Sequence, residues 1–198
     1  MIAVVQRYSI RIAAVVFVVL LMPPVKHALE ASMTTQMLVQ VPLLIAVGYL
    51  LCKALPQRLA AGIDAWNHRG ITGLVLATLA GMVWMLPRAL DAAVTELVVA
   101  VAKFISVPLL IGLPLGLSWP RMGFVVKGVF VLELIATFFR LGWLYLISPV
   151  RLCNNYLLDD QQRLGAYMLA IGAALLLWVV GKLLWGRFDS PPVKSSAD

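Results

Sequence analysis

Long apolar runs constrain this chain more than any other feature. They extend over about 17 to 25 residues each, the length that a tilted helix needs to cross a bilayer. The chain is 62% hydrophobic and 13% charged, with a mean hydropathy of +0.95. A membrane barrel would instead show alternating segments of about ten residues. The sequence therefore predicts an all-α fold, a polytopic membrane helix bundle.

Proline and glycine divide the apolar sequence into six predicted transmembrane helices, because these residues end or begin helices. The predicted spans are Ile10–Met22, Met33–Leu55, Gly70–Leu86, Ala92–Gly112, Met122–Ile147 and Arg163–Trp185. The region of Pro114, Gly116 and Pro120 is predicted to be a turn. We expect a single transmembrane domain over 1–188, and the Pro- and Ser-rich residues 189–198 to form a disordered cytoplasmic tail.

The distribution of positive charge predicts the orientation. The net charge is +7, but the basic residues are scattered at helix ends, which argues against a nucleic-acid surface. One side of the six spans holds Arg7, Arg11, Lys53, Arg58, Arg69, Arg121, Lys127, Lys182, Arg187 and Lys194, and the other holds Lys26, Arg88, Arg151 and Arg163. Both termini are therefore expected in the cytoplasm of a bacterium, with the chain in the inner membrane.

The N-terminal segment bears on signal-peptide cleavage, and the two cysteines bear on disulfide formation. Arg7 and Arg11 before an apolar run also resemble a signal peptide, but no small-x-small cleavage site follows, so a retained anchor is expected. Cys52 and Cys153 fall at opposite ends of the predicted bundle and form no CxxC pair, so no intrachain disulfide is expected.

Four charges lie deep in the predicted spans. The position numbers of Glu96 and Arg140 have the same sum as those of Lys103 and Glu133. In two consecutive antiparallel helices, one position number rises with depth while the other falls, so two pairs whose position numbers have the same sum each lie at matched depth. We therefore expect two stacked ion pairs, Glu96–Arg140 and Lys103–Glu133. Such pairs serve as structural links between helices, and a proton or ion relay is the alternative reading.

Polar and soft side chains gather at the predicted outer ends of the helices. The polar members are Gln36, Gln40, Asp91, Asp160 and Gln161, and the thioethers are Met37 and Met85. Thioethers suit Cu(I), although methionine also fills gaps in helix packing, so copper at these two methionines is one hypothesis. The two histidines lie on opposite sides of the membrane and cannot hold a haem together. No recognised catalytic motif occurs, so no enzyme activity is expected.

Three short segments resemble the CtaG-like family of proteins associated with assembly of cytochrome c oxidase. They are QMLVQVPLL from Gln36, WMLPRALDAAV from Trp84 and DDQQRLGAYM from Asp159. The family pattern has histidines, the natural copper ligands, at the positions of Gln36, Gln40 and Met85 here. The resemblance thus implies a divergent member without the family histidines, in which copper handling is weakened.

These observations together lead to a functional expectation. We expect a non-enzymatic inner-membrane accessory or assembly protein that contacts lipids and a respiratory complex of the haem-copper oxidase type. The alternative is a small transporter or channel-like protein that uses Glu96, Lys103, Glu133 and Arg140. A quinone-binding anchor subunit is a third reading, supported only by the polar outer residues.

Overall fold

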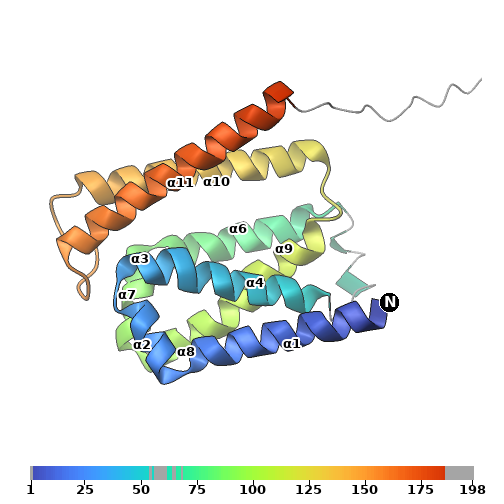
Figure 1. Cartoon of the computed structure of the whole chain (residues 1–198), viewed down its shortest axis with the longest axis horizontal. Helices are drawn as coiled ribbons and strands as arrows, with labels where there is room; N and C mark the ends of the chain where they lie inside the picture. Colours follow the sequence, from blue (N-terminus) through green and yellow to red (C-terminus); the bar gives the residue numbers. More distant parts are fainter. Residues whose placement is uncertain (1, 54, 56–61, 64–65, 68, 186–198) are drawn as a thin grey trace, which may run out of the picture.

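The computed structural model describes residues 2–53, 55, 62–63, 66–67 and 69–185. Every element in this part of the chain is helical, with no strand. Successive long helices run along the long axis in alternating directions (Figure 1). The first part comprises α1 (Ile2–Leu21), α2 (Pro23–Glu30), α3 (Met33–Thr35), η1 (Gln36–Gln40), α4 (Val41–Cys52), α6 (Ile71–Met85) and α7 (Pro87–Thr95). The second comprises α8 (Leu97–Ser106), η2 (Val107–Gly112), α9 (Leu113–Ser118), α10 (Phe124–Ile147) and α11 (Leu158–Trp185).

Two sharp bends have the same cause. A residue that precedes proline is pushed out of the helical region, and proline itself is well suited to the first helical position. Met22, before Pro23, and Leu86, before Pro87, both take an extended backbone, with ψ of 128° and 126°. The chain turns by 72° between α1 and α2 and by 68° between α6 and α7. Both short helices therefore lie across the same end of the molecule, here called the α2–α7 end (Figure 1).

Two π-helical segments also lie next to prolines. η1 ends two residues before Pro42, and η2 ends two residues before Pro114. A proline inside a helix lacks an N–H and its ring collides with the preceding turn, and a π-bulge is one way in which the helix absorbs this. The helix therefore continues past Pro114 and Gly116 to Ser118, so the predicted turn is wrong at these two residues, and the chain turns only at residues 119–121, around Pro120.

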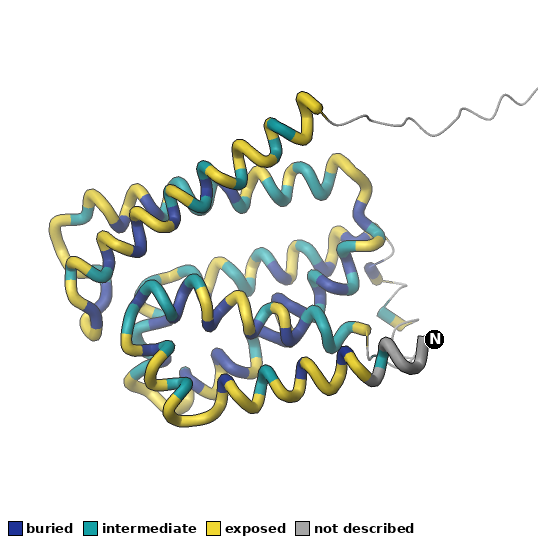
Figure 2. The backbone as a smooth tube through the Cα atoms, in the orientation of Figure 1, coloured by how far each residue is buried: buried dark blue, intermediate teal, exposed yellow. Residues whose placement is uncertain are grey.

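The core lies where α4 crosses the π-helical segment η2. Gly48 and Gly112 face each other at this crossing, and a Cβ atom added to Gly48 would lie 2.9 Å from the Gly112 Cα and would overlap the Pro108 carbonyl oxygen. Only glycine allows the two backbones to approach this closely. The buried positions of α4 and η2 face one another here, while much of α1 and α11 is exposed (Figure 2).

In the described part of the chain, the structure confirms an all-helical fold with several apolar helices compatible with a membrane, but it does not confirm six spans. Three helices are long and apolar enough to cross a membrane: Met33–Cys52, Leu97–Ser118 and Leu158–Trp185. Each bent pair, α1 with α2 and α6 with α7, could supply one more, which gives up to five. The fifth predicted span, Met122–Ile147, corresponds to α10, which is not among them and carries Lys127, Glu133 and Arg140 within its length. The predicted tail, 189–198, lies outside the described residues.

Candidate functional site

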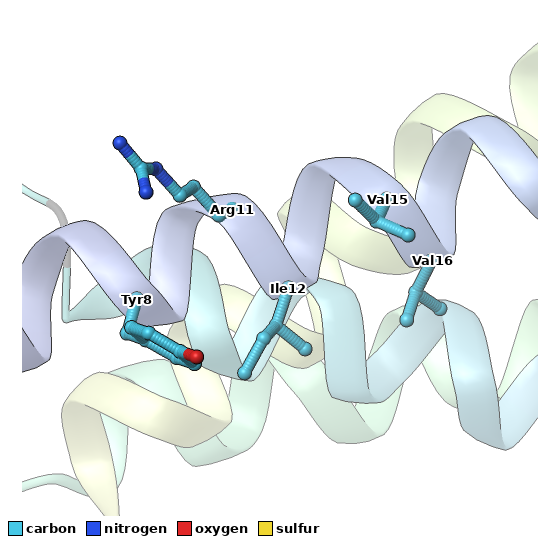
Figure 3. Close-up of a pocket in the computed structure, with 5 residues that line it drawn as sticks. All are labelled: Tyr8, Arg11, Ile12, Val15 and Val16. Atoms are coloured by element: carbon cyan, nitrogen blue, oxygen red, sulfur yellow. The ribbon is translucent and has the colours of Figure 1, made fainter.

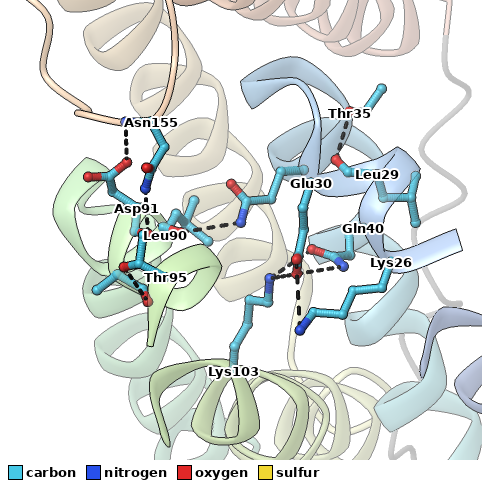
Figure 4. A network of polar contacts seen from close by, with 12 residues as sticks. Lys26, Leu29, Glu30, Thr35, Gln40, Leu90, Asp91, Thr95, Lys103 and Asn155 are labelled. Atoms are coloured by element: carbon cyan, nitrogen blue, oxygen red, sulfur yellow. Dashed lines mark hydrogen bonds and ion pairs between the residues drawn. The ribbon is translucent and has the colours of Figure 1, made fainter. Parts of the chain in front are cut away.

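A buried ion pair lies at the α2–α7 end of the bundle. The Lys103 ammonium donates to the Glu30 carboxylate at 2.7 Å and to the Gln40 side-chain oxygen at 2.9 Å. The Gln40 amide in turn donates to Glu30 at 3.3 Å. These three side chains close a ring of hydrogen bonds (Figure 4). We call Glu30, Gln40 and Lys103 the buried triad.

Three separate elements supply the triad. The bend at Met22 carries α2 across the end of the bundle, which brings Glu30, its last residue, over the helices. Gln40 comes from η1 and Lys103 from α8. Lys103 and Gln40 are 0% exposed and Glu30 is 7% exposed. Charges this deeply buried are tolerated only when paired and hydrogen-bonded, so the triad holds α2, η1 and α8 in one arrangement.

Tyr156 extends the network toward the loop between α10 and α11. Its hydroxyl lies 2.9 Å from the Glu30 carbonyl oxygen and 2.9 Å from the Gln36 side-chain oxygen. The Gln36 amide donates to the carbonyl oxygen of Leu90 in α7 at 3.3 Å. Burial, followed by the nearby Glu30 charge, raises the pKa of Tyr156 above its usual value, so the hydroxyl keeps its proton and acts as a donor.

Three of the predicted outer polar residues make separate contacts at this end of the bundle. Asp91 contacts the segment 148–157, and Asp160 and Gln161 make theirs from the start of α11. The Asp91 carboxylate accepts from the backbone N–H groups of Asn154 at 3.1 Å and Asn155 at 3.0 Å. Asp160 accepts from the Ser32 hydroxyl at 3.2 Å. These contacts are positioned to fix the loop onto the helix ends.

Gln161 makes the third contact. Its side-chain oxygen accepts from the backbone N–H of Leu152 at 2.9 Å, and its amide donates to the Tyr145 carbonyl oxygen at 3.3 Å. Gln161 is buried, so both ends of its amide are satisfied by backbone groups. The five predicted polar residues therefore lie at one end of the bundle, but each is engaged with its own partners.

Both predicted interhelical ion pairs are wrong. Lys103 pairs with Glu30, the last residue of α2, and not with Glu133. Arg140 pairs with Glu133 along its own helix and also donates to the Thr137 hydroxyl at 3.3 Å.

Glu96 and Lys103 do not belong to one continuous helix with the residues before Glu96, as the equal-depth pairing requires. The backbone is extended at Glu96, with ψ of 119°, so this residue caps the start of α8 and is exposed at a helix end. A carboxylate at the start of a helix is favoured by the helix dipole. The helix predicted over Ala92–Gly112 is therefore divided between α7, α8 and η2.

The two candidate copper ligands are part of the apolar core. The Met37 sulfur lies 3.8 Å from the Tyr145 hydroxyl, and Met37 is buried. Met85 is partly buried against the same cluster. Among the described residues, no group of three or more His, Cys, Asp or Glu side chains is placed to hold a metal ion. This environment matches the gap-filling use of methionine, and it leaves copper binding as a hypothesis.

The cysteines are free thiols, as expected. Cys153 is buried, and its thiol lies 3.5 Å from the Pro87 carbonyl oxygen. Burial, and then the nearby Asp91 carboxylate, raises the pKa of Cys153 to about 11. Because the thiolate is the form that binds metals and reacts, the raised pKa and the burial of Cys153 both disfavour metal binding at this thiol.

A shallow hollow lies on α1, away from the triad. It has a volume of about 310 Å³ and is lined by Tyr8, Arg11, Ile12, Val15 and Val16 (Figure 3). All five residues come from one helix, and most are apolar.

Glu30 and Tyr156 are central residues of this site that were not predicted from the sequence. Glu30 follows Pro23-Pro24 and lies outside every predicted span, although its spacing from Lys26 places both on one face of a short helix. Tyr156 stands in a loop without periodicity, so no local pattern marks it.

Comparisons of the chain with protein-family models, with curated proteins and with solved structures found no match. In the part of the chain that the structure describes, the fold is all-helical, with several helices long and apolar enough to cross a membrane and a buried ion pair at one end.

Proposed function

We propose that this chain is a non-enzymatic accessory or assembly protein of a respiratory complex of the haem-copper oxidase type. The proposal includes residence in a bacterial inner membrane, with both termini cytoplasmic, as the positive charges predict. Copper handling is a secondary role in this proposal, because the histidines of the CtaG-like pattern are absent.

One observation carries the proposal: the three segments that resemble the CtaG-like family meet at the α2–α7 end. Gln36 of the first segment bonds to Leu90 of the second. Asp160 of the third bonds to Ser32, four residues before the first. Segments that lie at least 40 positions apart in the sequence thus contact one another at this end, in part through buried residues such as Gln36 and Leu90. A scattered chance resemblance would not be expected to converge in this way.

The chemistry of the triad supports a structural role over a catalytic one. The acid, the amide and the amine bond mainly to one another, and the Lys26 ammonium lies 3.9 Å from the second Glu30 oxygen. Catalytic groups need a free position for a substrate within hydrogen-bond reach. A closed ring instead fixes helices and leaves the outer surface for contact with a partner.

The transporter alternative has less support. A carrier that used Glu96, Lys103, Glu133 and Arg140 would need these four charges to face a common path. Lys103 is buried in the triad, whereas Glu133 and Arg140 are exposed on α10 and Glu96 lies at the start of α8. The transporter alternative would then require a proton or ion relay that uses Lys103 without the other three charges.

Purification from native membranes in a mild detergent tests the proposal. We expect the tagged chain to retain a haem-copper oxidase, seen as haem absorbance and oxygen consumption in the purified fraction. We also expect less oxidase in membranes of a deletion strain. A chain that purifies alone, with normal oxidase in the deletion strain, would refute the proposal.

The copper content of the same fractions tests whether copper handling is a secondary or a primary role of the chain. We expect equal copper content with the wild-type chain and with Met37→Leu combined with Met85→Leu. Stoichiometric copper that disappears with this double substitution would make copper delivery the primary function.

A further inference from the structure

Three basic side chains lie around the end of α9, on the side of the bundle opposite to the α2–α7 end. α4 and α9 both finish on this side, and α6 begins there (Figure 1). The three residues, here called the basic cluster, are Lys53, Arg69 and Lys127. None of them forms an ion pair with a carboxylate of the described residues. Their positive charge is therefore not neutralised within this part of the chain.

The contact of α4 with α9 positions Lys53. A Cβ added at Gly116 in α9 would lie 2.6 Å from the Cys52 sulfur and 3.2 Å from a carbon of the Tyr49 ring. Lys53 follows Cys52 directly, and its ammonium lies 5.9 Å from the centre of the Tyr49 ring. Lys53 is thus exposed on the last turn of α4, beside the end of α9.

A tight turn before α6 positions Arg69 at the same place. The next residue, Gly70, has a left-handed backbone with φ of 73°, and a Cβ there would lie 2.7 Å from the Ser118 carbonyl oxygen. The Asn67 amide donates to the Ser118 hydroxyl at 2.9 Å. Ser118 is the last residue of α9, so both contacts hold Arg69 near the end of that helix.

Lys127 approaches from the first turn of α10. Its ammonium lies 5.6 Å from the centre of the Trp119 ring, and Trp119 packs edge to face against Phe130, with 6.3 Å between the ring centres. Arg121, on the same turn as Trp119, donates to the Leu117 carbonyl oxygen at 3.1 Å and is not counted in the basic cluster. An aromatic face attracts a cation but accepts few of its hydrogen bonds, so the ammonium keeps donors for another acceptor.

The basic cluster lies at one boundary of the candidate membrane spans. The spans Met33–Cys52 and Leu97–Ser118 both end here, one residue before Lys53 and one residue before Trp119. The bent pair of α6 and α7 begins two residues after Arg69. Tryptophan and tyrosine at the ends of spans are typical of the headgroup layer of a bilayer. The three cations therefore lie at the level of the lipid phosphates.

We infer that the basic cluster binds the headgroup of an anionic phospholipid through its phosphate. Lysine and arginine are the usual partners of phosphate oxygens, and basic residues grouped at the ends of transmembrane helices attract acidic lipids. A zwitterionic headgroup brings its own ammonium and leaves the positive charge of the cluster uncompensated, whereas an anionic headgroup neutralises part of it. The inference requires the chain to be in a membrane and is otherwise independent of the proposed function.

The α2–α7 end has no comparable excess of positive charge. Five described acidic residues lie there and outnumber the four basic ones. The acidic residues are Glu30, Asp91, Glu96, Asp159 and Asp160, and the basic residues are Lys26, Arg88, Arg151 and Arg163. The preference for anionic lipid is therefore expected at the basic cluster and not at the α2–α7 end.

Native mass spectrometry of the purified full chain in detergent tests this inference. The chain is titrated with phosphatidylglycerol and with phosphatidylcholine of identical acyl chains. We expect the phosphatidylglycerol adduct at about tenfold lower lipid concentration. Lys53→Gln combined with Lys127→Gln should weaken phosphatidylglycerol binding about tenfold and leave phosphatidylcholine binding unchanged, because two of the three cations are lost.

A matched variant removes the same amount of charge from the other end of the bundle. Arg88→Gln combined with Arg163→Gln replaces two exposed basic residues, and we expect it to bind phosphatidylglycerol as the wild type does. Thermal unfolding in detergent checks that each variant is folded. Arg69→Gln, a single change at an exposed residue, supplies a second test and should weaken the binding about threefold.

Inorganic phosphate separates a lipid site from a site for a free anion. We expect a hundredfold excess of phosphate over the lipid to leave the phosphatidylglycerol adduct in place, because the acyl chains anchor the lipid beside the helices. Displacement of the lipid by phosphate would identify a free-anion site and overturn the inference.

Three further outcomes would overturn it: equal affinity for the two lipids, undiminished binding in the folded variants of the basic cluster, or an equal loss in the Arg88 and Arg163 variant. The proposed function fails separately. A chain that prefers phosphatidylglycerol but retains no oxidase supports the lipid site and refutes the proposed function. Co-purification of an oxidase with a chain that shows no lipid preference does the reverse.

Discussion

Replacing Glu30 by Gln is expected to destabilise the protein by about 3 to 5 kcal/mol, the usual effect of removing one partner of a buried ion pair. The substitution keeps the size of the side chain but leaves the fully buried Lys103 ammonium without its counter-charge. Unfolding of the purified protein in detergent, followed by the fluorescence of its tryptophans, measures the effect.

The double variant separates the loss of the ion pair from a general sensitivity of the site. Glu30→Gln combined with Lys103→Met removes both charges, and we expect it to recover most of the lost stability. Lys26→Gln is the matched control, since Lys26 lies 3.9 Å from Glu30 but is partly exposed, and its loss should change stability by about 1 kcal/mol at most. If the double variant is less stable than both single variants, Glu30 and Lys103 are not coupled.

Gly48→Ala is expected to destabilise the crossing of α4 and η2 by about 3 kcal/mol, because overpacked interiors must shift to admit even one methyl group. The added Cβ would lie 2.7 Å from the Pro108 carbonyl carbon and 2.9 Å from the Gly112 Cα, both of which belong to a backbone that cannot rotate away. Thermal unfolding in detergent measures the loss, and Gly112→Ala should reproduce it from the other side.

Gly81→Ala is the control for this prediction. Gly81 also lies within an apolar helix, but a Cβ there meets no atom within 4 Å. Alanine has the higher helix propensity, so this change should be neutral or stabilising by about 1 kcal/mol. Equal losses at Gly48 and Gly81 would mean that the close approach of α4 and η2 does not exist.

The helical class and most helix positions could be predicted because they depend on local properties. Apolar runs of membrane length and the proline pairs mark where helices begin and end, as at Pro23 and Pro87. Short-range rules did not reveal that Pro114 is accommodated within a continuing helix. A preceding π-helical segment absorbs the proline, and this depends on the packing of η2 against α4.

The location of the candidate site was predicted, but the hydrogen-bond and ion-pair partners within it were not. Gln36, Gln40 and Asp91 do lie at one end of the bundle, because polar residues at the ends of neighbouring helices lie at similar positions along the bundle axis. Which acid pairs with Lys103 depends on the bend at Met22, which carries Glu30 back over the helices. Such a tertiary contact, between residues 73 positions apart, leaves no periodic trace in the sequence.

The measurement that tests the account most directly asks whether the distant segments meet at the α2–α7 end. Ser32→Cys and Asp160→Cys, in a chain whose native cysteines are replaced by alanine, place two thiols where a 3.2 Å hydrogen bond now joins the side chains. The control pair is Ala100→Cys with Ala136→Cys, which the equal-depth pairing of α8 and α10 would bring together and which lies on separate parts of the fold (Figure 1).

A short bifunctional thiol reagent, applied to the folded protein, should link positions 32 and 160 within one chain and leave positions 100 and 136 unlinked. A folded chain that links 100 to 136 but not 32 to 160 would contradict the convergence of the three segments, and with it the observation that carries the proposed function.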